Sequence, residues 1–461
     1  MAYVLIVFAF FLTVLNFVIS NYDFINPSVL FCGMNLIYSI VGCFVIVSYQ
    51  ITFHANTTFV LVLGMVTFTL FNIIARYGRR ISIRVKPRTM PIMYYKVRRL
   101  WLILFIAFEF LVAYYMIKYA KSASRAFYGS SGSLGQAIGN LNRIIKNYSD
   151  DFRKAGVHAS IIYTMGWPLC IAFNTLLSVI AICNYKVTHK LPLSLVVPYL
   201  IMILMSFLTG SRSTAFRFLT QLFIEYIIIH RWYQGNTTKG NIKLFVRLLV
   251  IGSIAIAGIT FSINLIGRSN SIPLFEYITA YVGGPFVNLD LVIDRDINTS
   301  TIFAQETLHH FYSLIGSRFH IPSLVYTLNI PYLYVKGHYL GNIYTMYYMF
   351  LEDFGYLGVF PLTAIIAYFY NSNYSILSKA GYSRRNISFR LFIYGYLFND
   401  LVMLTFSNRF YETALGKQAF LFYFYIAIIW FLFRQGVFTC HTNRSSVAGP
   451  SITMSSRKVC E

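Results

Sequence analysis

Long apolar runs recur along this chain, and they constrain its fold more than any other feature. Runs of about 17 to 23 apolar residues are long enough to cross the hydrocarbon core of a bilayer. In lipid every backbone amide needs an internal partner, so such runs predict helices even where β-preferring residues are frequent. We find eleven of them, at positions 2–19, 28–49, 58–75, 100–117, 160–182, 191–208, 213–230, 245–263, 355–372, 390–406 and 418–433.

The composition agrees with a membrane protein. Hydrophobic residues make up 57% of the chain and charged residues only 11%, whereas a soluble domain carries about 25% charged residues. The sequence therefore predicts an all-α integral membrane protein, one polytopic domain over residues 1–461, with about 11 (roughly 10–14) transmembrane helices. The net charge of +23 does not indicate nucleic acid as a partner, because the basic residues lie in short loops between spans.

The positions of Lys and Arg predict the orientation in the membrane. Segment 76–99 holds nine basic residues and no acidic one, which is typical of a cytoplasmic loop. Counting spans from this loop places the N-terminus outside, the C-terminus in the cytoplasm, and 23 of the 38 basic residues in inner segments. The partner that this organisation requires is the lipid bilayer.

The same count places two long loops on the outer face. Loop 118–159 is rich in Ser and Gly near its start, and we interpret it as a cover. Loop 264–354 is the longest polar segment, and we expect it to close an active site over the helices. Its apolar stretch 275–293 is broken by Gly-Gly-Pro, which favours a re-entrant segment lining a cavity over a further span.

Several chemistries are excluded by missing motifs. The six cysteines lack metal-ligand spacing, and no Walker loop, dinucleotide fingerprint, G-x-S-x-G elbow or HExxH motif occurs. We therefore expect neither a metal nor a cofactor.

Three arginines at outer ends of spans are candidates for binding a diphosphate. Arg212 lies in Thr-Gly-Ser-Arg-Ser-Thr at a predicted helix start, which favours anions. Arg268 and Arg409 also follow spans and have Ser and Asn neighbours. Guanidinium groups bind phosphate oxygens bidentately. The alternative for Arg212 is a role as an interface anchor whose aliphatic stem lies in lipid.

A general base is expected near such an anion site. The leading candidates are His338, Glu352 and Asp353, with Glu276 and Glu306 behind them. For Asp353 the alternative is a cap on the following helix. His309 and His310 are adjacent in the chain, cannot share one helix face, and are interpreted as surface residues.

Three acidic residues lie within predicted spans: Glu109, Glu225 and Asp400. Ionisable residues inside a membrane are functional candidates by default. Hydrogen bonding inside the bundle explains them adequately, and a proton relay of a transporter is the alternative.

Three patterns in this order resemble the bacterial oligosaccharide repeat-unit polymerases, the Wzy-type O-antigen polymerases. They are Thr-Gly-Ser-Arg-Ser at 209–213, Gly-Asn-Ile-Tyr-Thr at 341–345 followed by Asp-Phe-Gly at 353–355, and Asn-Arg-Phe at 408–410. The resemblance covers roughly residues 205–415, and the first two hundred residues add only the number of spans.

The resemblance implies an enzyme of the bacterial inner membrane that works at its periplasmic face on undecaprenyl-diphosphate-linked oligosaccharide. Such enzymes transfer the growing glycan from its lipid diphosphate to a new lipid-linked unit, and a chain-length regulator protein is a further partner. Arg212, Arg268 and Arg409 match arginines of the family, whereas His338 as base follows from this sequence alone. Tyr339, Tyr344 and Asn408 are the expected glycan-binding residues.

Two other functions remain open from the sequence. An O-antigen ligase shares the outer loop and the arginines, although the Gly-Asn-Ile-Tyr-Thr pattern favours the polymerase. A lipid-linked oligosaccharide flippase or other transporter predicts charges at mid-membrane and no large outer loop. Here most polar groups lie in the predicted outer segments, which favours an enzyme.

Overall fold

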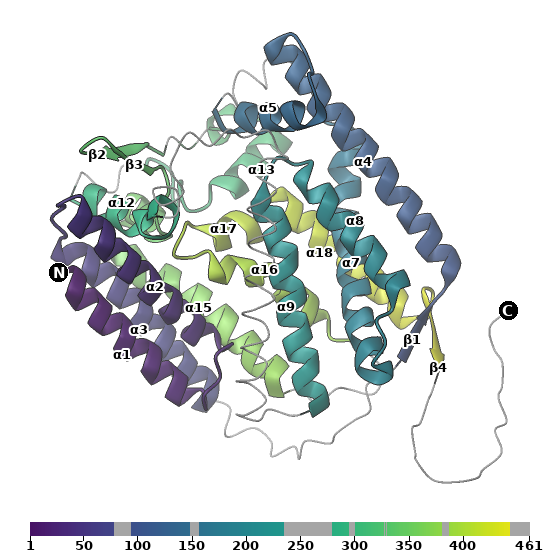
Figure 1. The fold of residues 1–461 in the computed structure, drawn as a ribbon, viewed down its shortest axis with the longest axis horizontal. Coiled ribbons are helices and arrows are strands. Elements are labelled where there is room, and N and C mark those ends of the chain that lie inside the picture. Colours follow the sequence, from purple (N-terminus) through teal and green to yellow (C-terminus); the bar gives the residue numbers. More distant parts are fainter. Residues whose placement is uncertain are drawn as a thin grey trace.

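The structure is a computed structural model, and it describes residues 1–77, 94–147, 156–234, 279–294, 300–326, 328, 330–379 and 387–442. Within these ranges the chain is mostly helical (Figure 1). The longer helices are α1 (Ala2–Ile19), α2 (Pro27–Ser48), α3 (Ala55–Tyr77), α4 (Arg99–Tyr128), α7 (Ile161–Thr188), α8 (Leu193–Phe207), α9 (Arg212–Gln234), α15 (Tyr356–Lys379), α16 (Phe389–Val402) and α18 (Lys417–Arg434). The shorter elements are α5 (Leu134–Asn147), α12 (Gly284–Val292), α13 (His309–Phe319), a 3₁₀ turn (Pro322–Leu324), α14 (Tyr347–Phe354) and α17 (Arg409–Ala414).

Six of the described helices are long and apolar enough to cross a membrane: α1, α2, α3, α4, α7 and α18. The chain is therefore an all-α, multi-pass membrane protein, as its composition predicts. Each predicted span coincides with a helix, except 245–263, which lies outside the described residues. The predicted number of about 11 spans is not confirmed: α8 and α16 are shorter, and α9 and α15 are long but not among the helices apolar enough to cross a membrane.

Two groups of helices pack side by side (Figure 1). In the first group α1, α2, α3 and α15 contact one another, and in the second α7 packs against α4, α8, α9 and α18. Helices α9 and α16 pack together and connect the groups, because α9 contacts α7 while α16 contacts α2 and α15. Helix α7 is the central helix, because 89% of its most apolar 18-residue stretch is buried inside the protein.

A buried ion pair also ties these groups together. Asp23, in the turn after α1, binds the guanidinium of Arg231 near the end of α9 with Oδ1–Nη2 and Oδ2–Nη1 distances of 2.6 and 2.9 Å. The Tyr374 hydroxyl of α15 donates to Asp23 Oδ2 at 2.6 Å and also bonds Arg231. Both charged groups are almost fully buried, and each compensates the charge of the other.

The first residues of the predicted outer loop 118–159 belong to helix α4. Helix α4 continues to Tyr128, well beyond the predicted span end, and α5 then folds back along it. The apolar face of α5 packs its residues Ile138, Leu141 and Ile144 on Ala120 and Ala123 of α4. This amphipathic helix is the only described part of the loop with regular structure after α4.

Helix α12 lies in the stretch interpreted as re-entrant. Its nine residues cover about 14 Å, far less than a membrane. It packs on α2 and α3, and a Cβ at Gly283, just before it, would lie 2.9 Å from the backbone nitrogen of Gly42. The described part, 279–294, is thus a short helix buried against the bundle.

Two small two-stranded antiparallel sheets complete the fold. Strand β1 (Tyr94–Val97) pairs with β4 (Thr439–Thr442) and joins the start of α4 to the segment after α18. Strand β2 (Leu333–Val335) pairs with β3 (His338–Gly341) through a turn in which Lys336 and Gly337 both have positive φ, as a type I′ hairpin requires.

Candidate functional site

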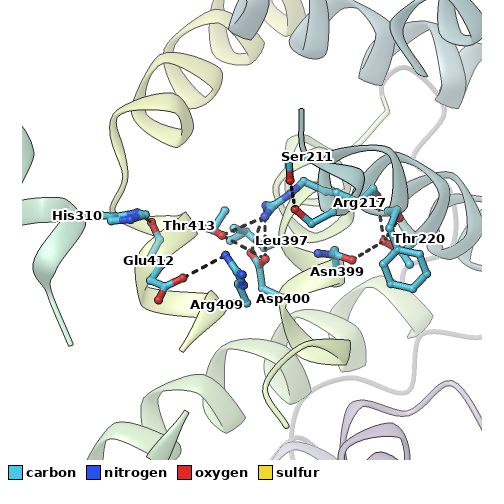
Figure 2. A network of polar contacts seen from close by, with 12 residues as sticks. Ser211, Arg217, Thr220, His310, Leu397, Asn399, Asp400, Arg409, Glu412 and Thr413 are labelled. Atoms are coloured by element: carbon cyan, nitrogen blue, oxygen red, sulfur yellow. Dashed lines mark hydrogen bonds and ion pairs between the residues drawn. The ribbon is translucent and has the colours of Figure 1, made fainter. Parts of the chain in front are cut away.

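A polar network joins α9, α16 and α17 near one end of the bundle (Figure 2). Arg217 Nη2 lies 3.0 Å from Asp400 Oδ1 and donates to Thr413 Oγ1 at 3.1 Å. The Thr413 hydroxyl donates to Asp400 Oδ1 at 3.2 Å. Asp400 is fully buried, so Arg217 compensates its charge. Sequence reasoning named Asp400 but not this partner, because no local pattern connects positions 217 and 400.

Arg409 lies beside this network, and not all of its N–H donors form hydrogen bonds within it. It is the first residue of α17, and its Nη1 is 3.4 Å from Glu412 Oε2, while Asp400 lies on its other side (Figure 2). Its Nε is buried without a hydrogen-bond partner among the described residues, and 36% of its side chain is exposed. A guanidinium offers five N–H donors, so Arg409 retains donors that the described residues do not use.

The turn before α9 brings Ser211 to the same network. Gly210 has φ +72°, and a Cβ there would lie 2.8 Å from Asn142 Cβ of α5, so this turn needs glycine and α5 covers it. Ser211 and Ser213 share a 2.6 Å hydrogen bond at the start of the helix. Arg212 is the first residue of α9; its side chain lies outside the described part of the structure.

Asp353 has a structural role that the sequence did not predict. Its Oδ1 accepts hydrogen bonds from Ser300 Oγ at 2.6 Å and from the Glu306 amide at 2.9 Å, and its Oδ2 accepts from the Thr307 amide at 2.7 Å. The carboxylate therefore holds the loop before α13, and it does not cap the following helix. With three donors on a buried carboxylate, Asp353 is better suited to positioning this loop than to accepting a proton.

Glu306 lies in the loop that Asp353 holds. Its carboxyl group is half-buried and makes no hydrogen bond or ion pair with the described residues. Burial, together with the nearby charges of Asp353 and Glu352, raises the pKa of Glu306 to about 7. A general base works best when its pKa is near the working pH. This raised pKa, together with a carboxyl group that forms no hydrogen bond with the described residues, makes Glu306 a better candidate for the base than the residues ranked above it.

Two contacts attach the Glu306 loop to α17. Asn408 donates from Nδ2 to the Thr307 carbonyl at 3.1 Å, and His310 Nδ1 lies 2.8 Å from the Glu412 carbonyl. Asn408 is buried, so its predicted glycan contact gives way to a role in joining these segments. His310 is exposed, as predicted for a surface residue, but it also links α13 to α17. Both contacts keep the loop beside Arg409.

The remaining predicted residues lie elsewhere or have other contacts. The His338 ring stacks on Tyr49 with centroids 4.1 Å apart, in the β2–β3 hairpin over the end of α2 (Figure 1). Tyr339 contacts the rings of Tyr332 and Tyr334 in the same hairpin. The described contacts do not bring these residues to Arg409.

Tyr344 and Glu352 are also partly or fully covered. Tyr344 is 3% exposed, stacks on Tyr348 and donates its hydroxyl to the Pro331 carbonyl at 3.0 Å; it therefore packs in the interior and offers no free face to a sugar. Glu352 is half-buried in α14. Arg268 and Glu276 lie outside the described residues.

No group of three or more His, Cys, Asp and Glu side chains that could hold a metal occurs in the described part of the chain. Comparison with family models, with curated proteins and with solved structures finds no match for this chain.

Proposed function

We propose that this membrane protein is a glycosyltransferase that polymerises undecaprenyl-diphosphate-linked oligosaccharide repeat units into O-antigen or a related surface polysaccharide. The proposal starts from the ordered sequence patterns around Arg212, Gly341–Thr345 and Arg409. The observation that supports it most is that Arg409, whose Nε has no hydrogen-bond partner among the described residues, lies beside the loop that carries Glu306. Asn408 joins this loop to the start of α17.

The proposed reaction needs one base and one anion site. Glu306 takes the proton of the acceptor hydroxyl while the hydroxyl oxygen attacks the anomeric carbon of the donor glycan. The bond from that carbon to the diphosphate breaks, its electron pair leaves with the diphosphate, and the configuration inverts. Arg409, with Arg212 and Arg268, stabilises the charge that develops on the diphosphate, where fixed cations help most.

Asp400 and Arg217 support this site in the proposal. Their buried pair fixes α9 against α16 and α17, and α17 starts with Arg409. The Ser-rich start of α9 lies beside the pair (Figure 2). The proposed location of the site is the periplasmic face of the inner membrane. The basic segment 76–99 is predicted to face the cytoplasm, and counting spans from it places the loops of the site on the opposite face.

The decisive experiment is the surface polysaccharide of a strain that lacks this protein, separated on a gel. Lipid A core with a single repeat unit is expected, because ligation continues while polymerisation stops. Bare core with free lipid-linked polymer would assign the chain as a ligase. Loss of all periplasmic repeat units would assign it as a flippase and remove the proposed reaction.

Complementation of that strain tests the site. Arg409→Ala is expected to lower polymer formation at least tenfold, and Arg409→Lys to restore little, because a point charge does not replace a bidentate guanidinium. Lys336→Ala, in the exposed hairpin, is the matched loss of one positive charge and should leave polymer unchanged. Wild-type polymer from Arg409→Ala at normal protein level would contradict the diphosphate site.

A further inference from the structure

The central helix α7 carries polar side chains on two faces, and each face meets a fully buried glutamate. Asn174 faces Glu109 of α4, while Thr175 and Ser178 face Glu225 and its neighbour Gln221 of α9. All of these side chains are at most 2% exposed. Glu109 and Glu225 take no part in the proposed transfer reaction.

The Glu109–Asn174 contact is one of the two hydrogen bonds that a carboxyl group and a primary amide can form with each other. Asn174 Nδ2 donates to Glu109 Oε1 at 2.6 Å. The other oxygens of the same two groups, Glu109 Oε2 and Asn174 Oδ1, are both buried without a hydrogen-bond partner among the described residues. A carboxylic acid and a primary amide bind through two hydrogen bonds, N–H to C=O and O–H to C=O. A proton on Glu109 Oε2 would supply the donor for this second hydrogen bond.

Glu225 has the same kind of surroundings. Gln221 Nε2 donates to its Oε1 at 2.9 Å, and Ser178 Oγ donates to its Oε2 at 2.6 Å. Gln221 Oε1 is buried and lacks a partner in the described structure. A Cβ at Gly395 of α16 would lie 2.9 Å from Glu225 Oε1. The backbone of α16 therefore lies against the carboxyl group at this position, and Gly395 brings no charged side chain to it.

No described cation compensates either carboxyl group. The titratable neighbours are the Cys170 thiol beside Glu109 and the Tyr199 hydroxyl beside Glu225, and neither of these groups can carry a positive charge. The described ion pairs involve other residues. A buried, unpaired carboxylate is costly inside a membrane protein, and such a group binds a proton instead.

We propose that Glu109 and Glu225 form two proton-binding sites on opposite faces of α7, each a neutral carboxyl group hydrogen-bonded to an amide. A metal ion fits less well, because oxygen-binding ions such as Ca²⁺ take about six to eight ligands, and Glu109 and Asn174 leave only two free oxygens. This proposal does not depend on glycosyl transfer.

Infrared spectroscopy of the purified full-length protein in lipid at neutral pH tests the sites directly. Protonated carboxyl groups give a separate carbonyl band that shifts in heavy water. Glu109→Gln and Glu225→Gln are each expected to remove the contribution of one group from this band. The control Asp294→Asn removes an exposed carboxylate and should leave the band unchanged.

Thermal unfolding gives a second readout with the same variants. Glutamine copies the shape and the donor of a protonated glutamate, so Glu109→Gln should unfold within a few degrees of the parent, whereas Glu109→Ala and Asn174→Leu should unfold earlier. An unchanged band in both glutamine variants would overturn the proposal. So would an unfolding temperature that rises with sodium chloride, relative to choline chloride, in the parent but not in these variants.

Discussion

At the scale of single residues, two neighbouring carboxyl groups have different roles because their surroundings differ. The carboxylate of Asp353 accepts hydrogen bonds from one hydroxyl and two backbone amides. Glu306 lacks such donors among the described residues, and its pKa is raised to about 7 by burial and by the charges of Asp353 and Glu352. One group therefore positions the loop, and the other is available to exchange a proton.

The pKa of Glu306 predicts how the proposed activity depends on pH. A general base acts in its deprotonated form, so polymer formation by the purified enzyme should rise as the pH passes through about 7 and level off above it. Glu306→Gln should lose most of the activity at every pH. A full rate with an unchanged pH profile in Glu306→Gln would show that another group accepts the proton.

Asp353 predicts an effect on stability instead. In Asp353→Ala the amides of Glu306 and Thr307 lose their acceptor, and each unsatisfied buried group costs about 1–3 kcal/mol. Chemical denaturation in detergent should show this loss. Asp294→Ala, which removes an exposed carboxylate, is the control and should stay within about 0.5 kcal/mol of the parent. Equal losses would contradict the positioning role.

At the scale of elements, the closest helix contacts need glycine. Gly283 brings the turn before α12 against the backbone of α2, where a Cβ would be 2.9 Å from Val41 C and Gly42 N. Backbone atoms cannot move aside as a flexible side chain does. The contact fixes α12 and, through Asn288, the segment that follows β3: Asn288 Nδ2 donates to the Leu340 and Ile343 carbonyls at 3.1 and 2.9 Å.

Gly283→Ala is therefore expected to push α12 away from α2 and to destabilise the protein by about 1–3 kcal/mol. Gly33→Ala is the matched control on α2, because its Cβ would meet only a methyl group of Thr13 at 3.9 Å. Alanine there should be neutral or slightly stabilising, since it favours helix over glycine. Thermal unfolding of both variants checks the difference, and equal unfolding temperatures would contradict the close contact.

At the scale of the whole molecule, the two helix groups depend on the buried cluster of Asp23, Arg231 and Tyr374. This cluster connects the α1–α2 turn to α9 and α15. Its charges are more than nine-tenths buried, so removing one leaves the other uncompensated. Such an uncompensated buried charge opposes the folded state.

Asp23→Ala should therefore cost about 3–5 kcal/mol, the range measured when one partner of a buried ion pair is removed. Asp294→Asn, at an exposed position, is the control and should stay within about 0.5 kcal/mol of the parent. Denaturation followed by tryptophan fluorescence measures both. A mild effect of Asp23→Ala would show that Arg231 reaches water or another acceptor.

The orientation in the membrane is a second prediction at this scale. A cysteine replacing exposed Ser130, between α4 and α5, should react with a membrane-impermeant maleimide added from the periplasmic side. A cysteine replacing Arg84, in the basic segment, should react only after the membrane is opened. Cys32, Cys43, Cys170 and Cys183 are buried, and replacing Cys440 and Cys460 by serine in the labelling background removes the other two thiols. The reverse labelling pattern would invert the topology.

The sequence by itself determined the class of fold. Apolar runs of membrane length predict helices whatever the tertiary packing, because lipid offers no partner to the backbone. The helices α1, α2, α3 and α18 begin and end within a few residues of the predicted spans, whereas α4 extends further. Arg409 could also be selected from its local pattern, because Asn and Arg after a span suggest an exposed anion site.

Only the tertiary structure decided which polar groups meet. Arg217 and Asp400 are 183 positions apart, and Asp353 binds amides 46 and 47 positions before it. These contacts depend on how each helix is rotated and on how loops fold back, and nearest-neighbour patterns along the chain do not encode either. The sequence thus determined what lies in the membrane, and packing determined which carboxyl groups are bonded and which remain free to bind a proton.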